Sequence, residues 1–484
     1  MDMPAIVFSD ITTLPQALHL IEGLVGFIGQ LQTRIEELEA ENKRLRDHLR
    51  LNSSNSSLPP SSDKGRGPRA TKSLRQPTGR KPGGQPDHPG ATLKSVEKPD
   101  KLVVHPVTQC PACGQDVSPV PVTRVDTRQV FELLPMKLEV TEHQAEVKIC
   151  PHCSQEIQGV FPADVRQPVQ YGARVKGLLV YLNHGQLLPY ERTTALVEDV
   201  VGQPVSQGTL LTATQTCAAH LAGTEESIKQ AVQQAAVAHF DETGLYENGR
   251  RLWLHSASTP TLTYYFPHEK RGQAALQAAE VLPHFHGIAV HDHWEAYQQF
   301  DNCQHAFCNA HHLRELQRAI DQDQAAWAEE MKTLLVQIKD HVDQAKAAGQ
   351  PALPTEQIAQ FEAQYRNLVD RALQSYMNAP AATTPPARGR RKQSTTKNLL
   401  DRLARYQAET LRFLTDFRVP FDNNLAERDL RMTKVKQKIS GTFRSSQGTQ
   451  AFCRIRGFIS TLKKQGRNVL EELTQTFSPL PNTT

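Results

Sequence analysis

Three acidic residues have the types and positions that metal-dependent phosphate chemistry requires. Asp241 follows the apolar run 235–240, and Asp292 follows a second apolar run, 287–291, 51 residues further along the chain. Glu427 lies in a later segment with helical periodicity. Hard cations such as Mg²⁺ prefer carboxylate oxygens, and two such ions can activate a hydroxyl and stabilise the leaving oxygen of a phosphodiester. A single acid after a strand is more often a solvated cap, so the hypothesis depends on the repeated placement.

Glu427 is the candidate third carboxylate because of the neighbours that a helix would give it. If residues 423–432 form a helix with Asp422 or Asn423 as its N-cap, one face combines a carboxylate with amides and a cation. The members of that face are Asn423, Asn424, Glu427 and Arg431. Such a face suits a phosphate group, whereas Asp429 is expected to point elsewhere. The pattern alone leaves the third ligand open.

Four of the eight cysteines form a second set of candidate ligands. They are arranged as two CxxC pairs, Cys110 with Cys113 and Cys150 with Cys153. In a reducing compartment, such pairs indicate one tetrahedral Zn²⁺ held by four thiolates rather than disulfides. Apolar residues alternate at 129–134 and 137–140, which predicts a small β-rich zinc module over 101–165. His105 and His143 could compete as ligands, but we interpret them as bystanders.

Two stretches of the chain are strongly basic, although the net charge of the whole chain is only +4. Residues 64–81 contain seven Lys or Arg and no acid, and residues 388–467 contain twenty against six Asp or Glu. Such stretches indicate a polyanionic partner, most often nucleic acid. The candidate DNA contacts are Arg80 and Lys81 in the first stretch and Arg428, Arg431, Lys434, Lys436, Lys438 and Arg444 in the second. The first stretch is equally well explained as a plain linker.

The N-terminal part of the sequence has the heptad pattern of a coiled coil. Aliphatic residues fill eight of nine core positions, which are Ile21, Ile28, Ile35, Asn42 and Leu49 at a, and Leu24, Leu31, Leu38 and Leu45 at d. A single Asn at position a favours a parallel dimer in one register. The charges at g and e agree with this, because Arg34 would face Glu39 of a partner. The alternative is an amphipathic helix that packs on its own chain.

The middle of the chain predicts a mixed α/β core. Three strands around an Asn248-Gly249 hairpin are followed by a helix and a fourth strand, and a fifth strand precedes a long helical stretch. This order is typical of ribonuclease H-like folds, in which the first and fourth strands lie side by side. Asp241 and Asp292 would then point into one shallow site.

The whole sequence therefore predicts a multidomain α/β protein with seven segments. They are a leucine-zipper coiled coil (14–51), a disordered basic linker (52–100), the zinc module (101–165), a helical segment with a possible helix-turn-helix (168–230), the first part of a ribonuclease H-like core (231–310), a helical stretch with a basic loop (311–398), and the C-terminal part of the core with the third acid (399–476). The Ser, Pro and Gly content of the linker leaves too little apolar surface for it to fold alone.

Several segments resemble the transposases of the insertion sequence 66 family. They are NSSNSSLPPSSD and GRKPGGQPDHPG ahead of the CxxC pairs, AHFDETGLYENGRRLWLHSAS, AVHDHWEAY, and FDNNLAERDLRMTKVKQKISGTFRSSQGTQAFCRIRGFISTLKKQG. The resemblance covers nearly the whole chain in the order of the family. It implies a DDE recombinase whose three acids are Asp241, Asp292 and Glu427. It also implies a helical insertion among the 134 residues between Asp292 and Glu427.

Two pairs of potential metal ligands lie near the second acid in the sequence. Members of the family often have a Cys-x2-His motif at this place, and Cys308 and His311 occupy it here. Two ligands make a poor zinc site, so we expect a structural role near the active site. His291 and His293 flank Asp292 and are interpreted as exposed histidines at a strand end rather than as ligands.

The function expected from these observations is Mg²⁺-dependent cleavage of DNA at insertion-sequence ends, followed by strand transfer into target DNA. Two Mg²⁺ (or Mn²⁺) ions and one structural Zn²⁺ would be the cofactors. The expected partners are inverted-repeat ends, target DNA, a second copy of the chain and possible helper proteins of the same element. One alternative is a catalytically idle, zinc-containing, dimeric DNA-binding regulator. A plain ribonuclease H-like nuclease is disfavoured by the zipper and zinc modules.

The composition argues against a membrane protein. No apolar run approaches the ~18 residues that a spanning helix needs, and the N-terminus lacks the pattern of a secretory signal. The sequence therefore predicts a bacterial cytoplasmic protein associated with the nucleoid.

Overall fold

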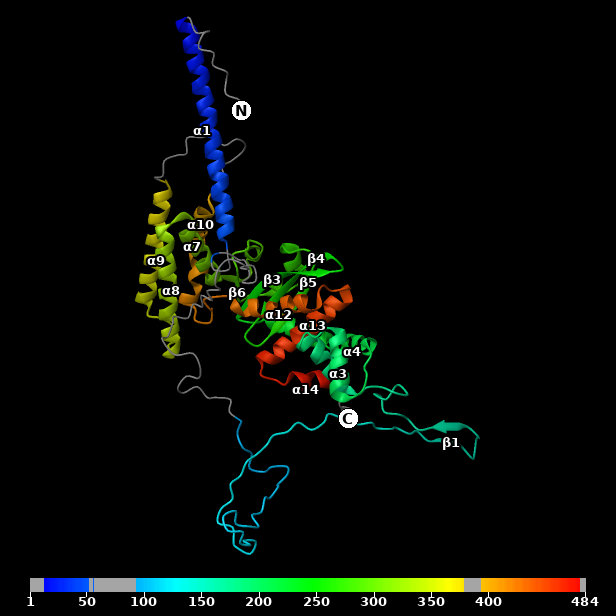
Figure 1. Ribbon diagram of the computed structural model, residues 1–484. Coiled ribbons are helices and arrows are strands. Elements are labelled where there is room, and N and C mark those ends of the chain that lie inside the picture. The colour runs from blue at the N-terminus through cyan, green and yellow to red at the C-terminus, as the bar shows by residue number, and fades with distance from the viewer. Residues whose placement is uncertain (1–12, 52–54, 56–92, 378–392, 479–484) are drawn as a thin grey trace. The chain divides into compact units, whose positions relative to one another are not determined.

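The computed structural model describes residues 13–51, 55, 93–377 and 393–478 (Figure 1). The chain is divided into two compact units. The larger unit comprises residues 1–69, 145–194 and 206–484, and the smaller comprises residues 70–144 and 195–205. Arg80 and Lys81, the predicted tip of the basic arm, lie outside the described residues.

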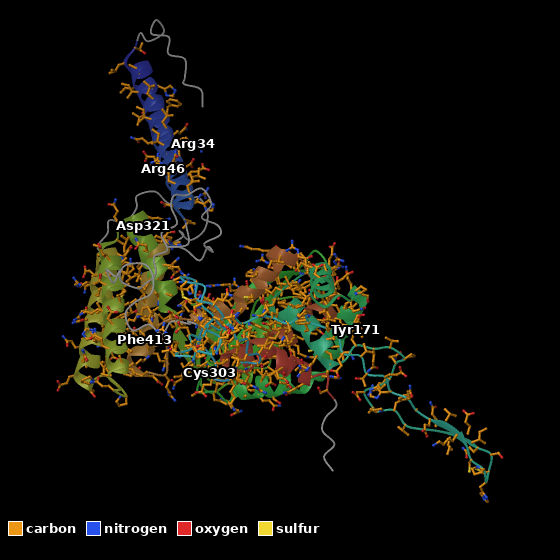
Figure 2. The ribbon with its side chains drawn as sticks, turned by 60° about the horizontal axis from the view of Figure 1, so that its bottom comes forward. Arg34, Arg46, Tyr171, Cys303, Asp321 and Phe413 are labelled. Atoms are coloured by element: carbon orange, nitrogen blue, oxygen red, sulfur yellow. The ribbon has the colours of Figure 1, made fainter. Side chains whose placement is uncertain are left out.

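The predicted zipper segment is a helix, α1 (Leu14–Arg50). Its apolar core positions are exposed in the single chain; Ile28, for example, is 52% exposed and Leu45 53%. The Arg34 and Arg46 side chains project from the helix surface (Figure 2). Arg34 pairs with Glu37 of the same helix at 2.8 Å. The helix is thus confirmed, whereas the coiled coil stays a prediction.

Residues 173–233 form the predicted helices. These are α2 (Ala173–Val180), which continues as a π-helical turn (Tyr181–Gly185), α3 (Tyr190–Val201), α4 (Gln207–His220) and α5 (Ala222–Gln233). Ser206 caps α4, because its Oγ accepts a hydrogen bond of 3.0 Å from the N–H of Thr209. α2 and α4 share a core with the C-terminal helices through Val180, Cys217 and Ile455. The helix-turn-helix pairing stays a prediction.

A five-stranded mixed sheet forms the centre of the larger unit (Figure 1). Its strands are β3 (Val237–Glu247), β4 (Arg250–Ser258), β5 (Thr263–His268), β6 (Ile288–His291) and β7 (Gln304–Phe307), in the order β5-β4-β3-β6-β7. β3 is antiparallel to β4 and parallel to β6. The predicted adjacency of the first and fourth strands is therefore confirmed.

The prediction that the first strand ends at Asp241 was wrong. β3 continues to Glu247, because the hairpin carries the antiparallel pairing with β4 that far. Asn248 and Gly249 have φ angles of 46° and 76°, the left-handed pair that a type I′ turn requires. Only the parallel pairing with β6 stops early, at His239.

Successive residues of β3 point to opposite faces of the sheet. Ala238 and Phe240 belong to the core on one face, which Phe285 and Tyr297 complete beside α6 (Gln273–Ala278). Val237 packs against the core on the other face. By this alternation Asp241 lies on the second face and Glu242 on the first.

Five helices confirm the helical stretch predicted after residue 311. They are α7 (Asn309–Asp323), α8 (Ala326–Ala347), α9 (Thr355–Met377), α10 (Thr395–Arg405) and α11 (Gln407–Thr415). Met331 and Tyr365 are fully buried in their common core. Tyr406 separates α10 from α11. Phe413 of α11 (labelled in Figure 2) packs edge-on against Phe421, at 4.9 Å between ring centroids.

The edge of the sheet at β7 is covered by α11. The Nε of Arg412 donates to the carbonyl of His305 at 2.7 Å, and its Nη1 donates to Gln304 at 2.8 Å. These bonds occupy an edge strand that would otherwise expose unpaired backbone groups. The insertion is thus packed onto the sheet and not merely attached by its ends.

Three helices close the chain: α12 (Asn424–Ser440), α13 (Ser446–Lys464) and α14 (Val469–Gln475). The hydroxyl of Tyr265 in β5 donates to the Asp429 carbonyl at 2.7 Å, and Lys434 donates to the Gly244 carbonyl of β3 at 2.6 Å. These bonds hold α12 across β3 and β5. The N-terminus of α12 is therefore positioned beside the strand that carries Asp241.

The module predicted to be β-rich contains less strand than expected. Within the described residues 101–165, the only strands are the short pair β1 (Val147–Ile149) and β2 (Glu156–Gln158). The stretches 129–134 and 137–140 form no strand, because alternating apolar residues alone do not supply a pairing partner. None of the described helices is long and apolar enough to cross a bilayer.

Candidate active site

Asp241 lies in β3 just beyond the point where that strand separates from β6. The pKa of its carboxyl is well above the usual range, because the group is buried and close to the negative charges of Glu242, Asp292 and Glu427. A carboxylate in this position gains from a cation that offsets the repulsion. The proximity of Asp292 and Glu427 to Asp241 is the arrangement expected from the sequence.

Asp292 directly follows β6, as predicted. Its Oδ1 accepts a hydrogen bond of 2.9 Å from the backbone N–H of Trp294, which fixes the carboxylate in a tight turn. Burial raises the pKa of Asp292, while this hydrogen bond and the charges of Arg271 and Arg402 oppose the shift.

Glu427 is in the first turn of α12. Its Oε1 lies 3.9 Å from Nδ1 of His311 and 3.7 Å from Nη2 of Arg314. Asp429 points away from this cluster, as predicted. Its carboxylate instead accepts hydrogen bonds from Ser258, Thr263 and Ser460 and pairs with Lys464 at 2.7 Å.

Asn423 fixes the N-terminus of α12 relative to β3. Its Nδ2 donates to the carbonyl of Phe240 at 2.8 Å, and its Oδ1 is bonded to Nδ1 of His239 at 2.8 Å. Its backbone N–H lies 3.1 Å from Sγ of Cys308. The amide thus binds backbone that β6 no longer pairs, one residue before Asp241.

The expectation that Asn423 shares a phosphate-facing surface with Glu427 was wrong, because its side chain is buried at 2% exposure. We expected either Asp422 or Asn423 to cap α12, and the structure favours Asp422. The Asn423 side chain makes no capping bond, whereas the Oδ1 of Asp422 accepts from the N–H of Asn424 at 3.0 Å. Asn424 remains exposed.

Glu242, a buried acid next to Asp241, was not among the candidate residues predicted from the sequence. Glu242 is 1% exposed at its side chain, and its Oε1 accepts two hydrogen bonds from Arg271, from Nε at 2.8 Å and from Nη2 at 2.6 Å. The hydroxyl of Tyr297 donates to the other carboxylate oxygen. Burial and the charge of Asp292 raise the pKa of Glu242, and Tyr297 and Arg271 oppose the shift. The only sequence signal was the Asp-Glu dipeptide, since Arg271 is 29 residues away.

Cys308 and His311 lie beside Glu427. Sγ of Cys308, a ring nitrogen of His311 and a carboxylate oxygen of Glu427 are within 4.8 Å of one another. Burial raises the pKa of Cys308 to about 12 and lowers the pKa of His311 to about 3. Because the neutral thiol already accepts the N–H of Asn423, these placements support the structural role near the active site.

His291 and His293 are not the exposed pair that we expected. His291 is fully buried, stacks on Tyr297 at 4.7 Å between ring centroids, and is bonded to His305 at 2.9 Å. His293 packs edge-on against Phe307 and Tyr406. Both rings therefore serve packing around the carboxylates.

The two CxxC pairs adopt the same local turn. In the first pair, the N–H of Cys110 donates to the Gln115 carbonyl and the N–H of Gly114 donates back to Cys110, at 2.9 and 2.8 Å. In the second, Cys150 makes the same bonds with Gln155 and Ser154, at the same distances. Gly114 and Ser154 both have positive φ, 76° and 57°.

Backbone N–H groups in these turns favour the thiolate form that metals bind. Hydrogen bonds from Ala112 and Cys113 lower the pKa of Cys110, and those from Cys153 and His152 lower the pKa of Cys150. The donor set and the turn geometry of each pair therefore fit half of a Cys₄ zinc site.

The predicted basic residues after Glu427 differ in their surroundings. Arg428, Arg431, Lys438 and Arg444 are exposed. Nζ of Lys436 instead lies 3.7 Å from the ring centroid of Phe443, and burial lowers the pKa of this lysine to about 8. Lys434 is bonded to Gly244, and burial together with the charge of Arg251 lowers its pKa.

The carboxylate cluster fits a hard divalent cation. Asp241 and Asp292 have raised pKa values, and oxygen ligands with excess negative charge are what Mg²⁺ selects. Oε1 of Glu427 is buried and makes no hydrogen bond in the described part of the chain. Such an atom can serve as a further ligand.

Comparison with known families identifies the class of the protein. A family model described as Transposase IS66 family matches residues 168–451, which is more than half of the chain. A second, described as zinc-finger binding domain of transposase IS66, matches residues 108–154 and includes all four CxxC cysteines. A third, a family of unknown function, matches residues 9–94. No curated protein matches the chain.

The protein is thus a transposase with a zinc-finger domain. More particularly, the chain belongs to the IS66 family of transposases. The resemblance inferred from the sequence is confirmed.

Proposed function

We propose that this transposase is an active DDE recombinase, which cleaves DNA at insertion-sequence ends and transfers the strand into target DNA. The observation that carries the proposal is the convergence of three carboxylates from β3, the end of β6 and the first turn of α12. The strand order β5-β4-β3-β6-β7 supports a ribonuclease H-like core.

In the proposed mechanism, Asp241, Asp292 and Glu427 would hold two Mg²⁺ (or Mn²⁺) ions. The chemistry supplied at this site would be polarisation of the scissile phosphate and activation of a water or a 3′-hydroxyl. The Asn423 amide keeps Glu427 in register with Asp241. The His291 and His312 rings are buried, are kept neutral by their lowered pKa, and both pack edge-on against Phe307.

The direct test is cleavage of a duplex carrying an element end, identified from inverted repeats that flank the gene. Purified full-length protein with Mg²⁺ or Mn²⁺ should nick this duplex at the end of the repeat and join the freed 3′-hydroxyl to a second DNA. A protein that binds the duplex and neither nicks nor joins it under any of these conditions would instead support the idle regulator.

Exposed basic residues on and after α12 should bind DNA phosphates. Replacing Arg428, Arg431, Lys438 or Arg444 singly by Gln should weaken binding to all sequences alike and lower the slope of log K against log salt by about 0.9. Lys436 is the matched control, because its ammonium already lies over Phe443. A change in sequence preference with an unchanged slope would indicate base readout instead.

The exposed apolar stripe of α1 should bind the same stripe of a second chain. Deleting residues 14–51 should convert a dimer into a monomer, as measured by light scattering with size-exclusion chromatography. Asn42→Ile should raise dimer stability but allow other oligomers, because the buried Asn specifies register at a cost in stability. A chain whose mass in solution is unchanged by the deletion would contradict this proposal.

The zinc ion should be structural. Metal analysis of the full chain should give one zinc per chain, and Cys110→Ser should lose it together with the fold of the module, because zinc binding contributes folding free energy. His105→Ala is the control and should retain the metal. Zinc that remains at full content in Cys110→Ser would rule out this ligand set.

A further inference from the structure

Two arginines and two tryptophans form an alternating stack of cations and aromatic rings next to Asp292 and Glu242. The Arg251 guanidinium lies 4.4 Å from the centroid of the Trp253 ring, and that of Arg271 lies 5.0 Å from the same centroid. Arg271 also lies over Trp294, at 4.3 Å. We refer to Arg251, Trp253, Arg271 and Trp294 as the arginine–tryptophan stack.

The stack begins at the active site. Trp294 is the residue whose N–H is held by Asp292, and the charge of Arg271 opposes the rise in the pKa of that aspartate. Along β4, Arg251 and Trp253 are two residues apart and so share one face of the strand, which is the face of Glu242 and not that of Asp241. The two faces meet at the edge of β3 that β6 leaves unpaired beyond His239. The stack therefore extends from Asp292 along the Glu242 face toward the β3–β4 hairpin.

Each guanidinium in the stack is held in place before any ligand binds. Arg271 is fixed by the two hydrogen bonds that its Nε and Nη2 donate to Oε1 of buried Glu242, which leaves Nη1 without an ion-pair partner in the described part of the chain. Arg251 packs over Gly244, where a Cβ would lie 3.3 Å from both its Nε and its Nη2. The absence of a side chain at Gly244 thus makes room for the Arg251 guanidinium.

Both arginines remain accessible to solvent. Arg271 is 42% exposed at its side chain, and Arg251 is exposed. A guanidinium is weakly hydrated, keeps its charge and presents a planar set of N–H groups that matches phosphate geometry. Stacking on indole fixes the plane, so little side-chain entropy is lost when a phosphate binds.

We propose that the arginine–tryptophan stack binds consecutive backbone phosphates of the DNA strand that leads away from the scissile phosphate. The inference rests on the proposed function, because it takes DNA as the ligand of the adjacent carboxylates. Lys434 of α12, whose pKa is lowered by burial and by the nearby charge of Arg251, adds a further cation close to Arg251. The stack fixes the direction of the strand and reads no sequence.

The test compares Arg251 with an exposed arginine of the helical insertion. Binding of the full-length protein to the element-end duplex is measured without divalent metal, as a function of salt concentration. Arg251→Gln should lower the salt slope by about 0.9, the value for one lost phosphate contact. Arg371→Gln, which removes the same charge from the surface of α9, should leave the slope unchanged. Arg251→Lys should keep the slope but bind more weakly, because it retains the charge and loses the planar stacking.

A second measurement needs no substitution in the stack. The chain has three tryptophans, so in a Trp327→Phe background the emission comes from Trp253 and Trp294 alone. Adding the end duplex should change that emission. If Arg251→Gln is folded, an unchanged slope, or an equal loss in Arg371→Gln, overturns the proposal. If Arg251→Gln is not folded, unchanged emission overturns it. These measurements report binding and not cleavage. A protein that does not cleave DNA would therefore contradict the proposed function, while the proposal for the arginine–tryptophan stack would still be tested by the binding data.

Discussion

Replacing any one of the three carboxylates should nearly abolish strand cleavage and joining. We expect Asp241→Asn, Asp292→Asn and Glu427→Gln each to reduce the cleavage rate by about a thousandfold or more. This figure follows because metal ions stabilise the transition state by several kcal/mol, and about 4 kcal/mol corresponds to that factor. The assay is cleavage of the element-end duplex with Mg²⁺ or Mn²⁺. Binding of the duplex should persist, because the zipper and zinc modules are unchanged.

The control for these variants is Asp422→Asn, a nearby acid that bonds only to Asn424 in the described structure. It should cut at close to the normal rate. The sequence alone would offer Asp429→Asn as an equal control. This variant should instead unfold more readily, because it removes the negative charge that pairs with half-buried Lys464. Normal cutting by Glu427→Gln would show that the third ligand is misassigned.

The same substitutions should not weaken the fold in the absence of metal. Because the pKa of Asp241 is raised in the folded state, that state binds more protons than the unfolded chain between the two pKa values. Stability therefore falls as pH rises through this window, and the loss persists at neutral pH. Asp241→Asn removes it, so its melting temperature without metal should equal or exceed that of the unsubstituted protein, and Mg²⁺ should raise only the latter.

Asn423→Leu should reduce both activity and stability, although its side chain touches no proposed metal ligand. The substitution leaves the buried Phe240 carbonyl and the His239 ring without their partners, which costs about 1–3 kcal/mol each. A total loss of about 3 kcal/mol should appear in denaturant unfolding. Displacement of α12 by about 1 Å would move Glu427 relative to Asp241 and lower the cleavage rate about a hundredfold.

Asn424→Leu is the matched control for this prediction. Asn424 is the next residue of α12, is exposed, and bonds only to Asp422 in the described structure. It should retain nearly full activity and stability. Equal behaviour of the two variants would mean that Asn423 has no positioning role.

The parts of the fold that followed from the sequence are those with strong local chemistry. The Asn248-Gly249 turn and the apolar runs of β6 and β7 identify themselves, because turn conformations depend on a few neighbouring residues. The adjacency of β3 and β6 followed from the order of the elements alone. The order of the elements therefore predicted that Asp241 and Asp292 share one site.

The features that could not be predicted from the sequence depend on contacts with residues far away in the chain. The polar residues 241–244 suggested that β3 ends, yet β4 pairs with them through the hairpin. Helical periodicity put Asn423 and Glu427 on one face but could not say which part of that face His239 and Phe240 would cover. Glu242 could not be distinguished from a solvated acid, because its partners Arg271 and Tyr297 come from later loops.

The long helical insertion between β7 and α12 has a consequence for the order in which the protein acquires activity. The sheet that carries Asp241 and Asp292 pairs within one continuous stretch of chain, and these contacts close early. Glu427 joins them only after the five insertion helices have been synthesised and α12 has docked. Contacts between residues far apart in sequence form late in folding. A partly synthesised chain would therefore contain the paired aspartates without the glutamate, and the proposed cleavage activity would have to wait until α12 was in place.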